Sequence, residues 1–203
     1  MKLAAVLVCT MAIAAVAETS ELSILSTYGD RAFRPGPGTL CIVTELGDTL
    51  VFTDQSDPEY MEDYAVYELS DFLPEQNCWV ITESFCGWDV IHLVNGLNGG
   101  ITDAVSLPEP SPDGTRLLCT HKDIVVGMLW NVMQIWRVYP DSLVLEFQYR
   151  NEPWGPLGAG WAGDGLIVFD SLIFHKSLDE FSHHPGSLRL SADGIWTPDD
   201  EDD

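Results

Sequence analysis

Basic residues are scarce in this chain of 203 residues. Lysine and arginine together number 9, against 32 aspartates and glutamates. Proteins that bind a phosphate backbone do so with clusters of Lys and Arg, whereas here the basic residues are scattered singly from Arg31 to Arg189. The composition therefore argues against nucleic acid as a partner. The same lack of positive charge disfavours an anionic membrane surface.

Several short motifs that identify common enzymes are also missing. The chain has no G-x-S-x-G nucleophile elbow, no phosphate-binding G-x-x-x-x-G-K and no H-E-x-x-H helix. Catalytic acids can still converge from distant loops, but a glycosidase mechanism depends on a separation in space that a sequence does not supply. No residue is therefore assigned a catalytic role.

No apolar run reaches the ~18 residues that a transmembrane helix needs. The run from Leu3 to Val16 follows Met1-Lys2 and ends in Ala15-Val16-Ala17. A short charged start, an apolar stretch and small residues at the end form the pattern of a secretory signal peptide. The sequence predicts a signal peptide over residues 1–17, cleavage after Ala17, and a periplasmic or secreted protein without a membrane span.

Cleavage after Ala17 leaves 186 residues with 8 basic and 32 acidic side chains, a net charge of −24. This length suits one domain with a genuine hydrophobic core. We expect a single β-rich domain over residues 18–197 and an acidic, disordered tail over 198–203, because the tail has too little apolar content to order itself. The charge by itself indicates solubility and selects no function.

Cysteines are few. Four remain after cleavage, namely Cys41, Cys78, Cys86 and Cys119. An exported chain meets an oxidising compartment, so the even number predicts two disulfides, with three pairings left open. A zinc site is disfavoured because no two of these cysteines form a Cys-x-x-Cys pair.

The hydrophobic pattern has a period of two, and turn residues interrupt it often. This predicts short antiparallel strands and an all-β fold. The segment Tyr64 to Phe72 is compatible with a helix or a strand, and the glycine-rich segment Gly155 to Gly165 is expected to be a mobile loop. The predicted strands are Leu40–Thr44, Thr49–Thr53, Cys78–Phe85, Val90–Val94, Ile101–Val105, Arg116–Thr120, Ile124–Leu129, Met133–Tyr139, Leu143–Tyr149, Leu166–Phe169 and a hairpin over Ser187–Trp196.

One stretch resembles a known family. Ser111-Pro112-Asp113-Gly114, followed by the apolar strand that ends at Cys119, is similar to the turn and strand of β-propeller blades in the TolB and WD40-like families. The resemblance covers about Trp79 to Phe169. It implies propeller-like β-repeats, as four small blades or a partial propeller; the alternative is a β-sandwich or barrel with the same turns. Propeller proteins mostly serve as interaction platforms, although fold does not fix function.

An acidic segment is the candidate cation site. Asp54, Asp57 and Glu59 carry carboxylates of the kind that Ca²⁺ prefers, but their spacing is not that of an EF-hand. The simpler interpretation is a solvated loop, so no cofactor is predicted and calcium is kept as the alternative. His92 alternates with valines on a strand, which is typical of a structural histidine that is hydrogen-bonded.

The aromatic residues lead to the functional hypothesis. Trp154 precedes the glycine-rich segment and Trp161 lies within it, and exposed tryptophans there would offer large contact areas for a sugar or a protein. The leading hypothesis is an exported interaction module that binds a protein or carbohydrate partner and performs no chemistry. The alternatives are an envelope hydrolase with carboxylates on separate loops, and a structural protein without a ligand.

Overall fold

The computed structural model of the chain describes residues 21–56, 64–85, 87–124, 130–151, 154–175 and 180–198. Within these ranges the chain forms fifteen strands in four antiparallel sheets, so the predicted all-β class is confirmed. The chain divides into two compact units, with the boundary between Asp103 and Ala104, where the sequence predicts one domain. The predicted signal peptide and the acids beyond Pro198 lie outside the described residues.

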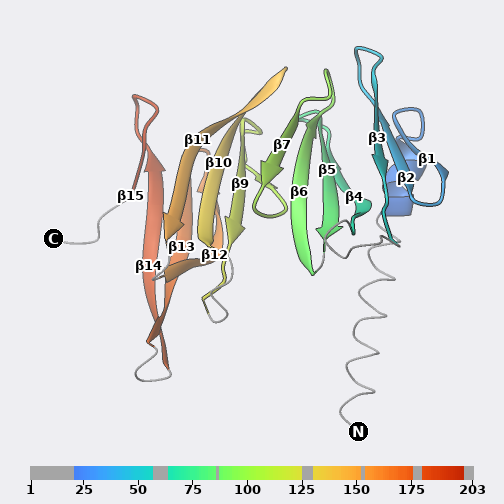
Figure 1. The fold of residues 1–203 in the computed structure, drawn as a ribbon. Helices are drawn as coiled ribbons and strands as arrows, with labels where there is room; N and C mark the ends of the chain where they lie inside the picture. Colours follow the sequence, from blue (N-terminus) through green and yellow to red (C-terminus); the bar gives the residue numbers. More distant parts are fainter. Residues whose placement is uncertain are drawn as a thin grey trace, which may run out of the picture. The chain divides into compact units, whose positions relative to one another are not determined.

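The first unit contains two sheets in which neighbours in the sheet are neighbours in the sequence (Figure 1). This meander order arises because short turns join the strands, and short turns connect antiparallel neighbours. Sheet 1 has three strands and sheet 2 has four. Their strands are β1 (Ala32–Gly36), β2 (Thr39–Val43) and β3 (Thr49–Thr53), then β4 (Val66–Leu73), β5 (Cys78–Phe85), β6 (Trp88–Asn95) and β7 (Ile101–Ala104).

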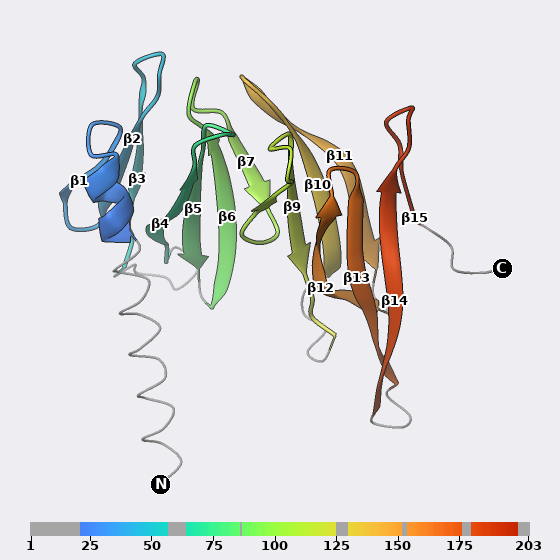
Figure 2. The ribbon, with the colours of Figure 1, turned by 180° about the vertical axis from the view of Figure 1, so that it is seen from behind.

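The core of the first unit lies between sheets 1 and 2. Ile42 and Trp79 are among its fully buried members, one from each sheet. A short helix over residues 21–27 adds Ile24 and Leu25 to this core, and Figure 2 shows the helix beside β1 and β2. Each fully buried side chain of this size contributes about 1.5–3 kcal/mol, so the two sheets are held chiefly by burial.

The second unit also consists of two meander sheets, and here both sheets have four strands (Figures 1 and 2). Sheets 3 and 4 pack through a core that includes Met133 and Ile135 of sheet 3 and Ile167 and Leu188 of sheet 4. Their strands are β8 (Glu109–Pro110), β9 (Arg116–His121), β10 (Asn131–Tyr139) and β11 (Ser142–Asn151), then β12 (Trp154–Gly163), β13 (Leu166–His175), β14 (Glu180–Leu190) and β15 (Trp196–Pro198).

Two turns in different units have the same construction. In each, a glycine with positive φ donates its amide to the carbonyl three residues earlier: Gly47 to Thr44 and Gly194 to Ser191, both at 3.0 Å. The hydroxyl of Thr44 or Ser191 accepts a further amide, four residues ahead, at 3.1 Å. Glycine reaches positive φ without a steric penalty. These turns join the predicted strands Leu40–Thr44 and Thr49–Thr53, and they close the predicted hairpin over Ser187–Trp196.

Some segments differ from the predictions or go beyond them. Tyr64 to Phe72, left open between helix and strand, contributes β4. Gly155 to Gly165, predicted as a mobile loop, is mostly the ten-residue strand β12. Pro110, a residue type that cannot donate a ladder hydrogen bond, lies in β8, where a two-residue strand at the sheet edge tolerates the missing amide. The predicted strand Ile124–Leu129 lies almost entirely outside the described residues.

Candidate interaction site

The turn that precedes β9 is closed by its own side chains. Ser111 Oγ donates to Asp113 Oδ1 at 2.6 Å, and the Thr115 amide donates to the same oxygen at 3.0 Å. Burial acts to raise the pKa of Asp113, but these hydrogen bonds and the nearby charge of Arg116 outweigh it and lower the pKa below its ordinary value. The segment that resembles a blade turn is therefore a rigid loop whose polar groups are hydrogen-bonded to one another.

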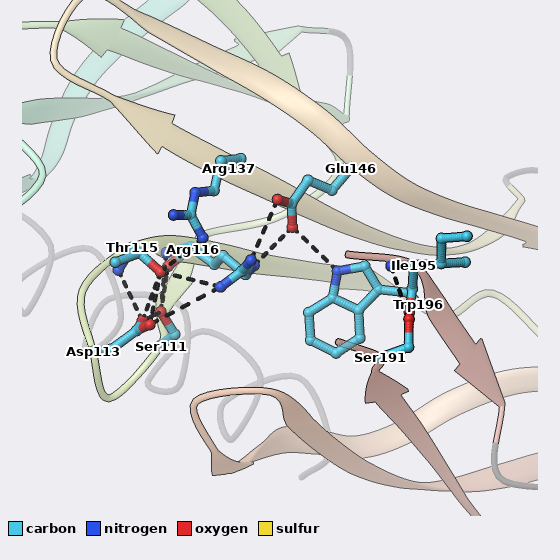
Figure 3. Close-up of polar contacts among 9 residues, drawn as sticks. All are labelled: Ser111, Asp113, Thr115, Arg116, Arg137, Glu146, Ser191, Ile195 and Trp196. Atoms are coloured by element: carbon cyan, nitrogen blue, oxygen red, sulfur yellow. Dashed lines mark hydrogen bonds and ion pairs between the residues drawn. The ribbon is translucent and has the colours of Figure 1, made fainter. Parts of the chain in front are cut away.

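A polar network then ties sheet 3 to sheet 4 (Figure 3). Arg116 of β9 donates to Glu146 of β11 at 2.7 Å, and Trp196 Nε1 of β15 donates to the same carboxylate oxygen at 3.2 Å. The guanidinium carbon of Arg116 also lies 5.8 Å from the centre of the Trp196 ring. Arg116 and Trp196 are buried. Because one carboxylate binds both sheets, the network fixes β15 against sheet 3.

Trp154 begins β12 and is stacked inside the second unit. The Tyr149 ring lies 4.4 Å from it and the Phe169 ring 5.5 Å from it, both nearly parallel to the indole. Trp154 is opposite Ile173 in the register, on the same face of the sheet as the buried Ile167. The exposed position predicted for Trp154 is therefore not what the structure shows.

Trp161 also faces inward. Its Nε1 donates to the Glu109 carbonyl at 2.9 Å, and its ring meets Trp196 edge-on at 6.0 Å. Trp161 is opposite Ile167 and packs against the core of the second unit. Both tryptophans predicted as partner contacts thus hold the two sheets together.

The opposite face of sheet 4 carries a hollow of about 510 Å³, which we call the outer hollow. Alternation along β13 turns Val168 and Asp170 away from the face that carries Ile167. Val168 lies opposite Ser187 in the register and is 45 % exposed. Ligand sites usually measure about 300–1,000 Å³. The lining of the outer hollow includes Leu157, Leu166, Val168, Asp170, Ser187 and Arg189.

The outer hollow combines an apolar floor with opposite charges. Leu157, Leu166 and Val168 supply aliphatic surface, and Asp170 and Arg189 add an anion and a cation to the lining. Such a surface can bury one apolar side chain of a ligand and hydrogen-bond the polar groups beside it. Asp170, Ser187 and Arg189 supply hydrogen-bonding groups beside the aliphatic surface.

A row of polar side chains crosses sheet 2 of the first unit. His92 contacts Glu83 at 2.7 Å through Nε2 and Asp103 at 2.8 Å through Nδ1, and Tyr67 donates to Glu83 at 3.1 Å. The prediction that His92 is hydrogen-bonded is therefore confirmed. Because both ring nitrogens already have carboxylate partners, the row leaves no ring nitrogen to accept a proton from a substrate.

The candidate cation residues are only partly described. Asp54 Oδ1 accepts the Tyr67 amide at 2.8 Å, while Asp57 and Glu59 lie outside the described residues. In the part of the chain that the structure describes, no three His, Cys, Asp or Glu residues are grouped as metal ligands. Calcium at this segment stays an untested alternative.

Cys41, Cys78 and Cys119 are buried free thiols, and Cys86 lies outside the described residues. If the four cysteines formed two disulfides, one of the two bonds would join two of Cys41, Cys78 and Cys119. All three are free thiols, so the structure does not contain the two predicted disulfides.

Burial raises the pKa of Cys78 from its ordinary 9.0 to about 12. The folded state thus holds the thiol proton of Cys78 more tightly than the unfolded chain does. The protonated thiol's contribution to the stability of the folded state is complete below pH 9 and is lost as the pH rises toward 12. We expect Cys78 to resist alkylation at pH 8 in the folded protein and to react on unfolding, as mass spectrometry of the labelled peptide would report. Rapid labelling without unfolding would contradict this.

No helix among the described residues is long and apolar enough to cross a membrane. Comparison of the chain with protein-family models, with curated proteins and with solved structures gives no match. The outer hollow was missed by sequence reasoning because Asp170, Ser187 and Arg189 alternate with buried residues, as they would on any solvated strand face.

Proposed function

We propose that this protein is an exported interaction module that binds a protein partner through the outer hollow of sheet 4. The observation that carries the proposal is an open hollow of about 510 Å³ with an aliphatic floor, Asp170 and Arg189 in its lining and Val168 exposed within it. Concave apolar sites with a few placed polar groups are the usual form of a binding site. In this proposal the protein recognises its partner and performs no chemistry.

The composition of the hollow favours a protein over a carbohydrate. A sugar ring is commonly held against an aromatic face, but Trp154 and Trp161 are engaged on the inner side of sheet 4. The hollow is lined mainly by aliphatic side chains, which suit an apolar side chain of a polypeptide, and its single ring, that of Phe169, is already stacked on Trp154. Asp170 and Arg189 then serve the backbone or polar groups on either side of that anchor.

If the partner binds at the outer hollow, charge complementarity favours a basic surface around the contact. The whole chain has a net charge of −23 and its basic residues are dispersed. Complementary charge raises association rates and suppresses wrong partners. We therefore take the partner to be a protein whose apolar contact is surrounded by Lys and Arg, and binding should weaken as salt is added.

The proposal extends to the architecture. The four meander sheets would act as small propeller-like blades, and the outer face of sheet 4 would be available for binding. Consecutive antiparallel sheets of three or four strands support this, since a propeller is a repetition of such sheets. The glycine turns shared by sheets 1 and 4 support it too, because a repeat reuses its local construction.

Paired aspartate substitutions test the site. Val168 in the hollow and Val144 on β11 are similarly exposed valines, at 45 % and 47 %. We expect Val168→Asp to reduce capture of the partner from a source-cell extract by at least about tenfold, since it buries a charge at the contact. Val144→Asp should leave capture unchanged, with circular dichroism confirming that both variants fold.

Two outcomes would contradict the proposed function. Equal capture by both variants would show that the outer hollow does not contact the partner. Capture that a free saccharide displaces, or that glycosidase treatment of the extract removes, would show that the ligand is a carbohydrate.

A further inference from the structure

His92 of β6 contacts a carboxylate through each of its two ring nitrogens. Nε2 lies 2.7 Å from Glu83 Oε2 in β5, and Nδ1 lies 2.8 Å from Asp103 Oδ1 in β7. A carboxylate oxygen only accepts hydrogen bonds, and a neutral imidazole carries a single N–H. Both contacts are therefore hydrogen bonds only when the cluster holds a second proton. The ring takes that proton, because imidazole is a stronger base than a carboxylate.

The ring of His92 is mostly enclosed, and its side chain is 14 % exposed. The titratable groups around it are the two carboxylates and Tyr67 of β4, whose hydroxyl donates to the second oxygen of Glu83 at 3.1 Å. On the side of sheet 1, the uncharged ring of Phe52 stacks on the imidazole at 6.5 Å. Asp54, which follows β3, accepts the Tyr67 amide at 2.8 Å. Each of these neighbours is an acid or uncharged, so the imidazole supplies the positive charge of the cluster.

The two carboxylates differ in their surroundings, so loss of the second proton breaks one particular contact. The side chain of Glu83 is 21 % exposed and also accepts the Tyr67 hydroxyl. The side chain of Asp103 is 70 % exposed, so water can replace the imidazole as its donor. The one remaining N–H therefore stays on Nε2, toward Glu83. The lone pair of Nδ1 then faces Asp103, and because two acceptors repel at 2.8 Å, the Asp103 carboxylate turns to solvent.

The contact that depends on the second proton lies at the end of sheet 2. The strands β5, β6 and β7 are neighbours in that sheet, and β7 is its last strand. Asp103 is also the last residue of the first unit, and the chain enters the second unit at Ala104. The side chains of Glu83, His92 and Asp103 thus join three strands and hold the chain where it leaves the first unit.

We infer that His92, Glu83 and Asp103 form a proton-dependent clasp that fastens β7 to sheet 2. The clasp is closed when both ring nitrogens carry a proton, and it opens at Asp103 when the ring is neutral. Histidine changes its charge between about pH 5 and 8, so the clasp closes as the pH falls through this range and opens as it rises. The clasp lies in the first unit and is independent of the outer hollow in the second.

The test is nuclear magnetic resonance of the full chain at pH 5.5 and pH 8.5. We expect the ring nitrogen shifts of His92 to show both nitrogens protonated at pH 5.5 and only Nε2 protonated at pH 8.5. Hydrogen-exchange protection factors of the β7 amides, corrected for the effect of pH on intrinsic exchange, should fall by roughly twofold to fivefold between the two, since a contact to an exposed carboxylate is weak. Protection in β2, in the other sheet of this unit, is the internal control and should not change.

Three variants assign the effect to the clasp. Asp103→Asn should make β7 protection equal at the two pH values, because the amide side chain can accept from a protonated Nδ1 and donate to a bare one. His92→Gln, which cannot change its charge, should also remove the pH dependence. If His92→Gln fails to fold, the exposed Asp103→Asn keeps the test open. His183→Gln, at a histidine of sheet 4, is the matched control and should keep the pH dependence of β7.

Three outcomes overturn the inference. Equal β7 protection at pH 5.5 and pH 8.5 in the wild type would show that the contact with Asp103 does not depend on the proton. A pH dependence of β7 that survives Asp103→Asn would place its origin elsewhere. A His92 ring that keeps its proton on Nδ1 at pH 8.5 would show that the contact with Glu83, and not the one with Asp103, is lost.

Discussion

Replacing Glu146 by alanine is expected to lower the free energy of unfolding by about 3 kcal/mol. The carboxylate is the partner of Arg116 at 2.7 Å and of Trp196 Nε1 at 3.2 Å, and Arg116 is only 7 % exposed. Removing the partner of a buried charge typically costs about 3–5 kcal/mol, and the cost is smaller here because Glu146 itself is partly open to solvent. We expect the lower end because Asp113 lies 4.0 Å from the guanidinium and shares part of the charge.

Urea denaturation of the wild type and the variant measures this difference. Val144→Ala, two residues away on the same strand and 47 % exposed, is the matched control and should change stability by less than about 0.5 kcal/mol. A loss for Glu146→Ala as small as that of the control would show that the network does not hold sheet 4 to sheet 3.

Replacing Trp154 by alanine is expected to destabilise the protein by about 3 kcal/mol. The substitution removes the ring between Tyr149 and Phe169 and leaves a cavity, and large aromatic-to-alanine changes in packed sites cost about 3–5 kcal/mol. Trp130, which is 44 % exposed with Arg150 over its ring, is the control. Trp130→Ala should cost no more than about 1 kcal/mol.

Thermal or urea unfolding again gives the result. If Trp154→Ala keeps wild-type stability and loses its partner, the indole is a binding contact and our placement of it in a structural stack is wrong. If it loses stability as expected, Gly186→Ala should reproduce that loss of stability. A Cβ at Gly186 would lie 2.8 Å from the Phe169 ring and displace the same stack.

The sequence predicts where the strands of this protein lie better than it predicts which face of each strand is buried. Turn chemistry is local, so the Asp-Gly and Gly-Asp pairs identify hairpins that the structure contains. β12 was missed because its glycines resemble those of a loop. One of them is required by packing, since a Cβ at Gly155 would lie 2.6 Å from Asn131 Oδ1, and that approach comes from a residue twenty-four positions earlier.

The site could not be predicted for a similar reason. Exposed tryptophans were expected at Trp154 and Trp161, but which face of a strand is buried depends on the sheet packed against it. Sheet 3 covers the face that carries both indoles, and the face with Val168 and Asp170 is left open. The number of strands per sheet is likewise a property of the whole fold.

Site-specific photo-crosslinking tests the central claim most directly. A benzophenone amino acid placed at Val168, in the outer hollow, or at Val144, on β11, would be activated while the full chain is mixed with the source-cell extract. We predict a discrete crosslinked protein from position 168, suppressed by salt, and none from position 144. Crosslinking from position 144 alone, or equally from both positions, would contradict the account.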